Sequence, residues 1–173
     1  KSTLARRSLG IGYIGLAHYL AKNKVKYDDK KAWKLVDEIT EAFQYYLLKA
    51  SNTLAKERGA CEYFEKTKYS DGILPIDSYK KDVDDIVKRK LSYDWTSLRN
   101  DIKSSGLRHS TLSAQMPSES SSVVSNATNG VEPPRDFLSI KKSKKGTLKQ
   151  IVPDYNRLKN FYTLLWDMQG NEG

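Results

Sequence analysis

The chain has 173 residues, of which 38% are hydrophobic, and this is enough apolar side chain for one domain with a real core. A formal net charge of +9 admits nucleic acid, an acidic membrane surface or phosphorylated ligands as partners. Lys and Arg are, however, spread along the chain among Asp and Glu, and the one dense basic cluster is at 141–145. We therefore expect a solvated basic surface and no direct binding of nucleic acid.

Cysteine and histidine are scarce, which argues against two kinds of stabilisation. A single cysteine, Cys61, cannot form an internal disulfide and is typical of a reducing compartment. With His18 and His109 as its two histidines, the chain lacks a ligand set for structural zinc, and we expect no metal site. No apolar run reaches the roughly 18–20 residues of a transmembrane helix, so we expect a cytoplasmic protein without a membrane partner.

The two ends of the chain lead to a further expectation. Residues 5–24 combine an arginine pair with a mostly apolar run, as secretory signals do, but no small-residue cleavage site follows. We interpret this segment as a buried helix. The sequence starts at Lys1 rather than Met and stops soon after an apolar segment at 160–168. We expect both ends to be cuts, so that the chain is an interior piece of a longer polypeptide.

Residues 1–60 are predicted to form an antiparallel pair of helices. Apolar residues crowd positions 9–20, which suits a helix that is buried on most sides. Asp28 or Asp29 is placed to cap a second helix, which Gly59 would end in the left-handed conformation. This second helix carries residues at steps of three and four that predict its buried stripe, namely Trp33, Val36, Thr40, Phe43, Leu47, Ala50 and Leu54.

Residues 61–106 are predicted to contain a loop and short helices. A loop with aromatic side chains comes first, and Asp77 or Ser78 then opens a charged amphipathic helix to about Arg89. A further helix is predicted over 95–105.

The pattern changes after that helix. Asp94 is placed to cap the helix over 95–105, and Gly106 to terminate it. Within 107–134, the residues at 107–117 alternate as a strand does, and small polar residues then run to an Asn-Gly stop. We expect a strand that leads into a phosphate-binding loop and helix.

The last part of the chain, 135–173, is predicted to form a hairpin and a helix. A β-hairpin at about 137–152 has its turn at 144–146. The Pro-Asp pair at 153–154 breaks the second arm, and a helix follows at 155–168.

Residues 10–15 read GIGYIG, a literal match to the dinucleotide-binding fingerprint G-x-G-x-x-G. That fingerprint requires a preceding strand, and an acidic residue about 20 positions later at the end of a second strand. Only nine mostly charged or polar residues precede the motif, and no such acidic residue follows it. Close packing of helices explains the glycines more simply, so we assign no dinucleotide binding.

The segment 110–130 has the features of an anion site. Pro117 has the fixed φ that suits the start of a helix, and the serines after it would present free backbone N–H groups at the positive end of a helix dipole. Such groups attract phosphate oxygens, and serine hydroxyls add adaptable donors. The alternative is an ordinary helix start with a capping box, of which Ser118 and Ser121 form a poor version. The residues alone leave both readings open.

A family resemblance favours the anion site over the ordinary helix start. The string WTSLRNDIKSSGLRHSTLSAQMP at 95–117 resembles the signature of the large subunit of class I ribonucleotide reductases, and SESSSVVSNATNGVEPP at 118–134 resembles its continuation. Flanking segments agree, namely RRSLGIGYIGLAHYLA (6–21), AFQYYLLKASNTLAKERGAC (42–61), GILPIDSYKKDVD (72–84) and QIVPDY (150–155). The resemblance covers essentially the whole chain and is nearest to the bacterial and phage class Ia branch.

The resemblance implies a fold and a substrate site. The large subunit of that family is a ten-stranded α/β barrel with ribonucleoside diphosphates at its centre, and residues 1–173 would be one piece of this barrel domain. The resemblance therefore implies an α/β fold class for this piece, rich in helices and with few strands. Relatives often have threonine at the position of Ser120, so the hydroxyl is retained, and asparagine is common at His109, to which we assign no catalytic role. The residues that match the family's diphosphate-binding segment, through main-chain amides and hydroxyls, are Pro117, Ser118, Glu119, Ser120 and Ser121.

The family's radical chemistry is not matched in this chain. The thiyl-radical cysteine, the redox cysteine pair and the tyrosine pair of the radical relay have no counterpart here. Cys61 matches a helical region outside the family's active site, and Tyr45 and Tyr46 are expected to pack within a helix. We therefore expect no catalytic residue and no cofactor in this segment, and no reductase activity from the isolated chain.

The resemblance also implies the partners of the parent enzyme. These are a ribonucleoside diphosphate, the remainder of the large subunit or a complementary split chain, a second large subunit in a dimer, and a small subunit that carries the radical cofactor. Thioredoxin- or glutaredoxin-type reductants would recharge the enzyme, and nucleotide effectors would bind elsewhere. The alternative from a different class is a non-catalytic basic module that binds phosphate or nucleic acid.

Overall fold

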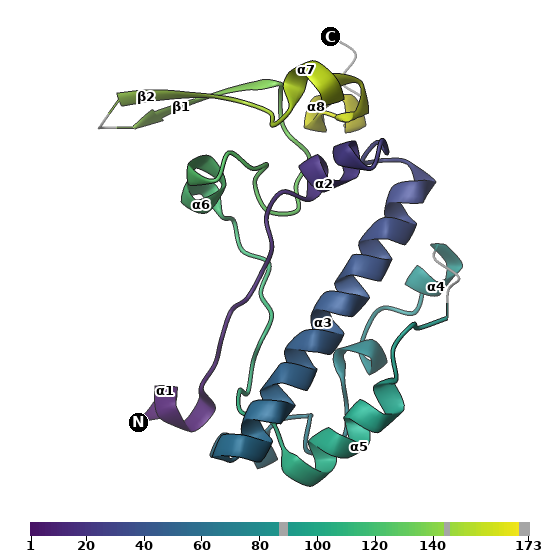
Figure 1. The fold of residues 1–173 in the computed structure, drawn as a ribbon, viewed down its shortest axis with the longest axis vertical. Coiled ribbons are helices and arrows are strands. Elements are labelled where there is room, and N and C mark those ends of the chain that lie inside the picture. The colour runs from purple at the N-terminus through teal and green to yellow at the C-terminus, as the bar shows by residue number, and fades with distance from the viewer. Residues whose placement is uncertain (87–89, 144–145, 170–173) are drawn as a thin grey trace. The chain divides into compact units, whose positions relative to one another are not determined.

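The computed structural model describes residues 1–86, 90–143 and 146–169. The chain divides into two compact units, each built from two separate stretches of sequence. Unit 1 comprises Lys1–Ile11 and Val36–Ala114, and unit 2 comprises Gly12–Leu35 and Gln115–Gly173. Figure 1 labels the helices and strands of both units.

Two helices form the centre of unit 1. Helix α5 (Trp95–Ser105) packs against the C-terminal half of helix α3 (Lys30–Arg58) (Figure 1). The shorter elements of this unit are α1 (Ser2–Arg6), η1 (Phe64–Lys66), η2 (Pro75–Asp77) and α4 (Val83–Ile86). Together they enclose one core of Tyr45, Leu48, Cys61, Phe64, Leu74, Trp95, Leu98, Ile102, Leu107 and Leu112.

Helix α5 has the boundaries that its sequence predicts. The carboxylate of Asp94 accepts a hydrogen bond from the backbone N–H of Ser97 at 2.9 Å, which satisfies one free donor of the first turn. Gly106 follows the helix with φ 75°, and a Cβ at that position would lie 2.6 Å from the Cβ of Ala60. Only glycine fits both the backbone conformation and the space, so the stop signal is also a packing requirement.

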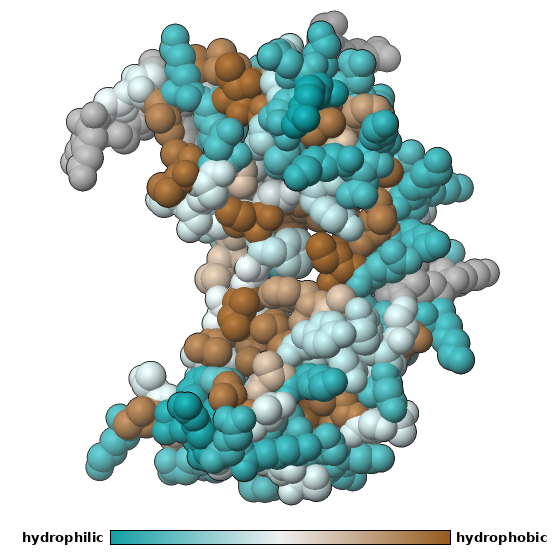
Figure 2. All heavy atoms as spheres, in the orientation of Figure 1, coloured by the Kyte–Doolittle hydropathy of each residue, from teal (hydrophilic) through white to brown (hydrophobic). Residues whose placement is uncertain are grey.

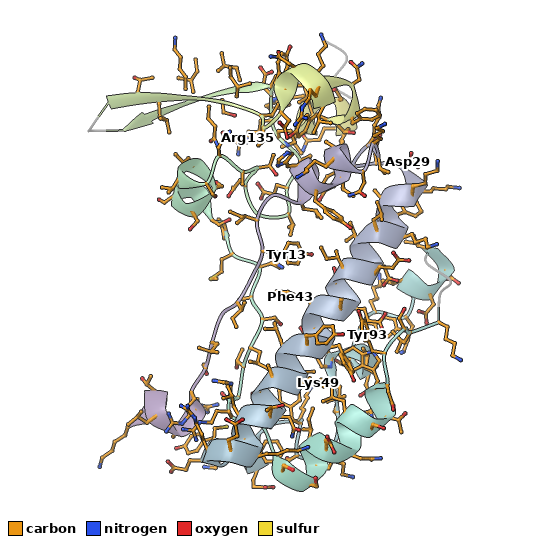
Figure 3. All side chains as sticks on the ribbon, viewed as in Figure 1. Tyr13, Asp29, Phe43, Lys49, Tyr93 and Arg135 are labelled. Carbon is orange, nitrogen blue, oxygen red and sulfur yellow. The ribbon has the colours of Figure 1, made fainter. Side chains whose placement is uncertain are left out.

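Helix α3 also begins and ends as predicted. It starts one residue after Asp29, whose carboxylate accepts a hydrogen bond from the N–H of Lys31 at 3.0 Å, and Figure 3 shows Asp29 at this end. It ends before Gly59, which has φ 80°. Of the two aspartates considered as caps, Asp29 is therefore the one that acts, and the other, Asp28, accepts a hydrogen bond from Thr163.

The buried face of α3 differs from the predicted apolar stripe. Trp33 and Ala50 of that stripe are exposed, whereas Glu41 and Asn52 are buried. Glu41 accepts a hydrogen bond from the indole N–H of Trp95 at 2.9 Å, and Asn52 donates to two carbonyl groups at the end of α5. The prediction was wrong because polar contacts with distant residues decide which face is buried. Hydrophobic periodicity does not detect such contacts.

The predicted helix over 9–20 is wrong for its first half. The backbone there is extended, and the N–H groups of Leu9 and Ile11 donate to the carbonyls of Thr111 and Leu112 at 2.9 and 2.8 Å. The pairing is parallel, with one bridge between Ile11 and Ser113. Backbone pairing with the segment predicted as a strand thus overrides the helical pattern, although no full strand forms there among the described residues.

The charged helix predicted after Asp77 is much shorter than expected. Its described part is α4, which covers four residues, and the rest of the predicted helix, 87–89, lies outside the described residues. Asp77 does not cap it. Instead, the Asp77 carboxylate accepts hydrogen bonds from the Leu74 N–H at 2.8 Å and from the Arg99 guanidinium at 2.6 and 2.9 Å. The side chain that was expected to start a helix thus binds to the turn that begins at Leu74 and to helix α5.

Unit 2 contains the predicted β-hairpin. Strands β1 (Leu138–Ser143) and β2 (Gly146–Ile151) are antiparallel, in the register that pairs Leu138 with Ile151. The first two residues of the predicted turn, 144–145, lie outside the described residues. Figure 2 shows hydrophobic side chains exposed along the hairpin, and the most exposed apolar residues of its strands are Leu138, Ile140, Leu148 and Ile151.

Short helices surround the small core of unit 2. These are α2 (Leu16–Lys22), α6 (Glu119–Val124), α7 (Tyr155–Leu158), η3 (Lys159–Phe161) and α8 (Leu165–Met168). The buried residues of the core are Ala17, Ala21, Val152 and Tyr162.

The single helix predicted at 155–168 is in fact three short ones. The break after η3 is explained by polar contacts that need a non-helical backbone: the Thr163 hydroxyl accepts a hydrogen bond from the Tyr27 N–H at 3.1 Å, and the Leu165 N–H donates to the Pro134 carbonyl at 2.8 Å. Among the described residues, no helix is long and apolar enough to cross a membrane. The same residues contain no group of three or more His, Cys, Asp or Glu side chains that could hold a metal ion.

Candidate functional site

The predicted phosphate-binding residues lie at the start of helix α6. Ser118 precedes the helix with φ −113° and ψ 46°, and its own side chain makes no capping hydrogen bond. Pro117, Ser120 and Ser121 are exposed, and the side chain of Glu119 lies outside the described part of the structure. The capping box considered for Ser118 and Ser121 is therefore absent as far as the described atoms show.

The backbone donors of this helix start belong to exposed residues. The N–H groups of Ser120 and Ser121 have no acceptor among the carbonyls and side chains that the structure describes, as expected for a first helical turn. Their hydroxyls belong to exposed residues as well. Two amides and two hydroxyls are therefore available to an anion in one short stretch of chain.

Asn129 fixes the beginning of this loop. Its side-chain Oδ1 accepts a hydrogen bond from the Ser118 N–H at 3.1 Å. Gly130, with φ 51°, follows closely enough that a Cβ there would lie 3.6 Å from the Met116 carbonyl oxygen. Sequence reasoning took this Asn-Gly pair as a stop signal and missed its role in holding the loop.

The loop that ends at Gly130 also caps helix α2. The Gly15 N–H donates to the Thr128 carbonyl at 3.0 Å, the Leu16 N–H to the Gly130 carbonyl at 3.3 Å, and the His18 N–H to the Thr128 hydroxyl at 3.4 Å. The amides after GIGYIG are thus occupied by protein oxygens. This geometry agrees with the rejection of a dinucleotide fingerprint, because the fingerprint would need these donors for a pyrophosphate.

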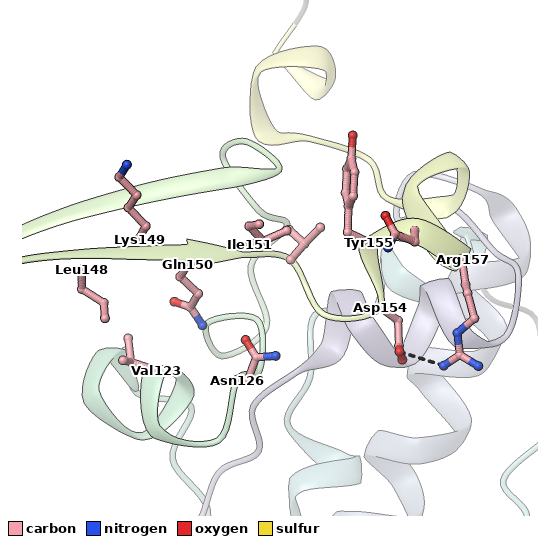
Figure 4. Close-up of a pocket in the computed structure, with 11 residues that line it drawn as sticks. Val123, Asn126, Leu148, Lys149, Gln150, Ile151, Asp154, Tyr155 and Arg157 are labelled. Atoms are coloured by element: carbon pink, nitrogen blue, oxygen red, sulfur yellow. Dashed lines mark hydrogen bonds and ion pairs between the residues drawn. The ribbon is translucent and has the colours of Figure 1, made fainter.

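Unit 2 has an open groove of about 680 Å³ at the other end of α6 (Figure 4). Its walls come from β2, from α7, from Val123 of α6 and from Asn126 shortly after that helix. Asp154 is bound by Arg157 at 2.7 Å and by His18 at 3.0 Å, and these two hydrogen bonds hold the pKa of the Asp154 carboxyl below its usual range. The groove does not include residues 117–121, so the predicted site is a surface loop rather than the base of this pocket.

The other residues that the sequence singled out serve as packing elements of unit 1. The Nδ1 of His109 lies 2.9 Å from the Ser51 hydroxyl, and burial, with Arg108 and Arg7 nearby, lowers the pKa of His109. Cys61 is buried in the core, and this burial raises the pKa of its thiol. The ring of Tyr45 stacks on that of Tyr93, which Figure 3 shows beside α3, at 4.7 Å.

Comparisons with known proteins identify the family. A family model described as the barrel domain of ribonucleotide reductase matches residues 1–169. The chain belongs to the ribonucleotide reductase family. Over all 173 residues, it is 62% identical to the ribonucleoside-diphosphate reductase subunit alpha of Haemophilus influenzae and 59% identical to the ribonucleoside-diphosphate reductase 1 subunit alpha of Escherichia coli. It is also 48% identical over 169 residues to the alpha subunit of phage T4.

The chain is much shorter than these reductase subunits. It spans 23% of the Haemophilus influenzae and Escherichia coli proteins and 22% of the phage protein. The fold-class prediction is confirmed at the coarser level, because the matched part is the reductase barrel domain and the described structure is rich in helices with one two-stranded antiparallel sheet. The alternative of a separate basic module that binds phosphate or nucleic acid is not favoured by this match.

Proposed function

We propose that this chain is a piece of the alpha subunit of a class Ia ribonucleoside-diphosphate reductase, and that residues 117–121 bind the diphosphate of its substrate. The observation that carries this proposal is the set of free donors at the start of α6. Ser120 and Ser121 are exposed, their amides have no acceptor among the described residues, and Asn129 fixes the backbone of Ser118 just before them. Free amides at a helix start are a common protein device for holding phosphate oxygens.

The barrel itself is part of the proposal. Neighbouring strands in α/β proteins are commonly parallel, and the parallel pairing of Leu9 and Ile11 with Thr111 and Leu112 supports two neighbouring strands at these positions. The complete enzyme would reduce ribonucleoside diphosphates in the cytoplasm by thiyl-radical chemistry. Several parts of that enzyme would act from outside this chain. These are its cysteines, its small radical-carrying subunit, its second alpha subunit, its thioredoxin- or glutaredoxin-type reductant and its nucleotide effectors.

The role of the loop is tested in the complete alpha subunit with its small subunit and reductant. Ser120→Asp places a negative charge beside the free amides, so we expect the KM for CDP to rise at least about tenfold, since like charges repel at short range. Ser125→Asp is the matched control, because it puts the same charge at the far end of the same helix, and we expect less than about a threefold change. Equal effects of the two substitutions would contradict the proposed loop.

A further inference from the structure

Unit 1 contains a pocket of about 380 Å³ that the proposed function does not use. It lies where α1, the end of α3 and the segment that follows α5 come together (Figure 1). Three of its lining residues are arginines, namely Arg7, Arg58 and Arg108, and His109 lines it as well. The volume is within the usual range for a small-molecule site, which runs from about 300 to 1,000 Å³.

Two of these arginines, Arg7 and Arg108, lie close enough to the same two groups to change their pKa values. Both Arg108 and Arg7 lower the pKa of His109, after the larger effect of burial. The same two guanidinium groups also act on Cys61, where they oppose the rise in pKa caused by burial. The positive charges of Arg7 and Arg108 therefore act to lower the pKa values of two separate titratable groups.

No carboxylate neutralises this potential within the described residues. None of the ion pairs found there involves Arg7, Arg58 or Arg108. Cations held near one another without an anion repel, and a bound anion would remove that cost.

A purely structural role explains the presence of only one of the three arginines, Arg108. The guanidinium of Arg108 donates to the carbonyls of Arg58 and Gly59 at 3.0 and 3.1 Å, and so caps the end of α3. The guanidinium groups of Arg7 and Arg58, by contrast, have no hydrogen-bond acceptor in the part of the chain that is described. Their donors are free for a ligand.

We propose that this pocket binds a small phosphate-bearing molecule, held by Arg7 and Arg58. Guanidinium presents two parallel N–H donors, which match the oxygens of a phosphate group. The apolar lining of the pocket, which includes Leu4 at 67% and Leu9 at 41% exposure, would cover the uncharged part of the ligand. The pocket belongs to unit 1 and the diphosphate loop to unit 2, so this site does not depend on the proposed function.

Phenyl phosphate is a suitable probe, since it combines one phosphate with an apolar ring. We expect saturable calorimetric binding to the full 173-residue chain, tighter than that of inorganic phosphate. Arg58→Gln and Arg7→Gln should each weaken it at least about tenfold, because charge-assisted bonds are strong, and Arg58→Lys should weaken it less. Lys68→Gln is the matched control: it removes one exposed cation of unit 1 outside the pocket, and the affinity should stay within about twofold.

The histidines supply a second readout, because the chain has two of them and His109 alone lines this pocket. In NMR titrations, phenyl phosphate should raise the pKa of His109 and shift its ring signals, whereas the ring signals of His18 should not move. Three results would overturn the proposal: equal weakening by Lys68→Gln and Arg58→Gln, equal shifts of both histidines, or phenyl phosphate binding no tighter than inorganic phosphate.

Discussion

The side-chain oxygen of Asn129 accepts a hydrogen bond from the backbone N–H of Ser118 at 3.1 Å, across eleven residues of sequence. This contact closes the segment that contains α6 and sets where the free amides of its first turn begin. It is therefore the structural basis on which the proposed diphosphate site depends.

Removing this contact should loosen the loop. Asn129→Ala leaves the Ser118 N–H without its acceptor, so we expect the free energy of unfolding to fall by about 1 kcal/mol. We also expect weaker binding of CDP, by roughly three- to tenfold, because the loop must then be ordered by the ligand. Calorimetric titration and urea unfolding of the same variant measure the two effects, and unchanged affinity would show that Asn129 does not position the site.

The buried amide of Asn52 should contribute strongly to unit 1. It donates to the carbonyls of Asp101 and Gly106 at 3.1 and 2.9 Å. Asn52→Ala removes the donor of the Gly106 carbonyl and opens space beside the core, whereas the Asp101 carbonyl keeps a hydrogen bond from the Ser104 hydroxyl at 3.0 Å. We expect a loss of about 2–3 kcal/mol in the free energy of unfolding, measured with urea. Thr53→Ala, at an exposed neighbouring position, should stay within about 0.5 kcal/mol. Similar losses for both would mean that the Asn52 contacts stabilise nothing.

Gly59 and Gly106 both have a positive φ, but Gly106 combines it with ψ −169°, a conformation almost restricted to glycine, and with a crowded Cβ position. Gly59→Ala has φ 80° and no atom within 4 Å of the new Cβ, so it should cost about 1 kcal/mol. Gly106→Ala adds a contact at 2.6 Å to the Cβ of Ala60 and should cost at least about 3 kcal/mol. Thermal unfolding of the two variants side by side tests the difference, and equal costs would argue against the close approach of α5 and residue 60.

Acid should weaken unit 1 through Asp77. Its hydrogen bonds from Arg99 hold the pKa of Asp77 below the usual value of 3.8. The stability that this lowered pKa provides is therefore complete above pH 3.8 and is lost as the pH falls through the folded-state pKa. Asp77→Asn should be less stable than the parent at pH 7, and the difference should shrink below pH 3.8. Urea unfolding at several pH values measures this, and a difference that does not change with pH would contradict the pairing.

Local signals in the sequence predicted several elements correctly. Asp94 and Gly106 mark the ends of α5 because each satisfies a requirement of the helix terminus itself. The predictions for Asp29, Gly59 and the hairpin are correct for the same reason. These features depend on residues a few positions apart, which is the range over which sequence patterns are informative.

The failures arise where distant residues decide the structure. The extended backbone at Leu9 and Ile11 depends on a segment about 100 residues later, and the division of the last helix depends on contacts with Tyr27 and Pro134. For the candidate site, the sequence and the family resemblance predict residues 117–121, and this assignment stays a prediction; the contact from Asn129 was not predicted. An Asn-Gly pair predicts a turn, and nothing local indicates which distant amide its side chain will bind.

The most direct test of the diphosphate site is an NMR titration of the backbone amides of the 173-residue chain with CDP. We predict that the amide signals of Ser120 and Ser121 move most, and downfield, because their protons gain phosphate acceptors. The signals of Gly15 and Leu16, whose N–H groups are already bonded within the protein, should move little. CDP binding that shifts signals elsewhere and leaves Ser120 and Ser121 unchanged would contradict the account.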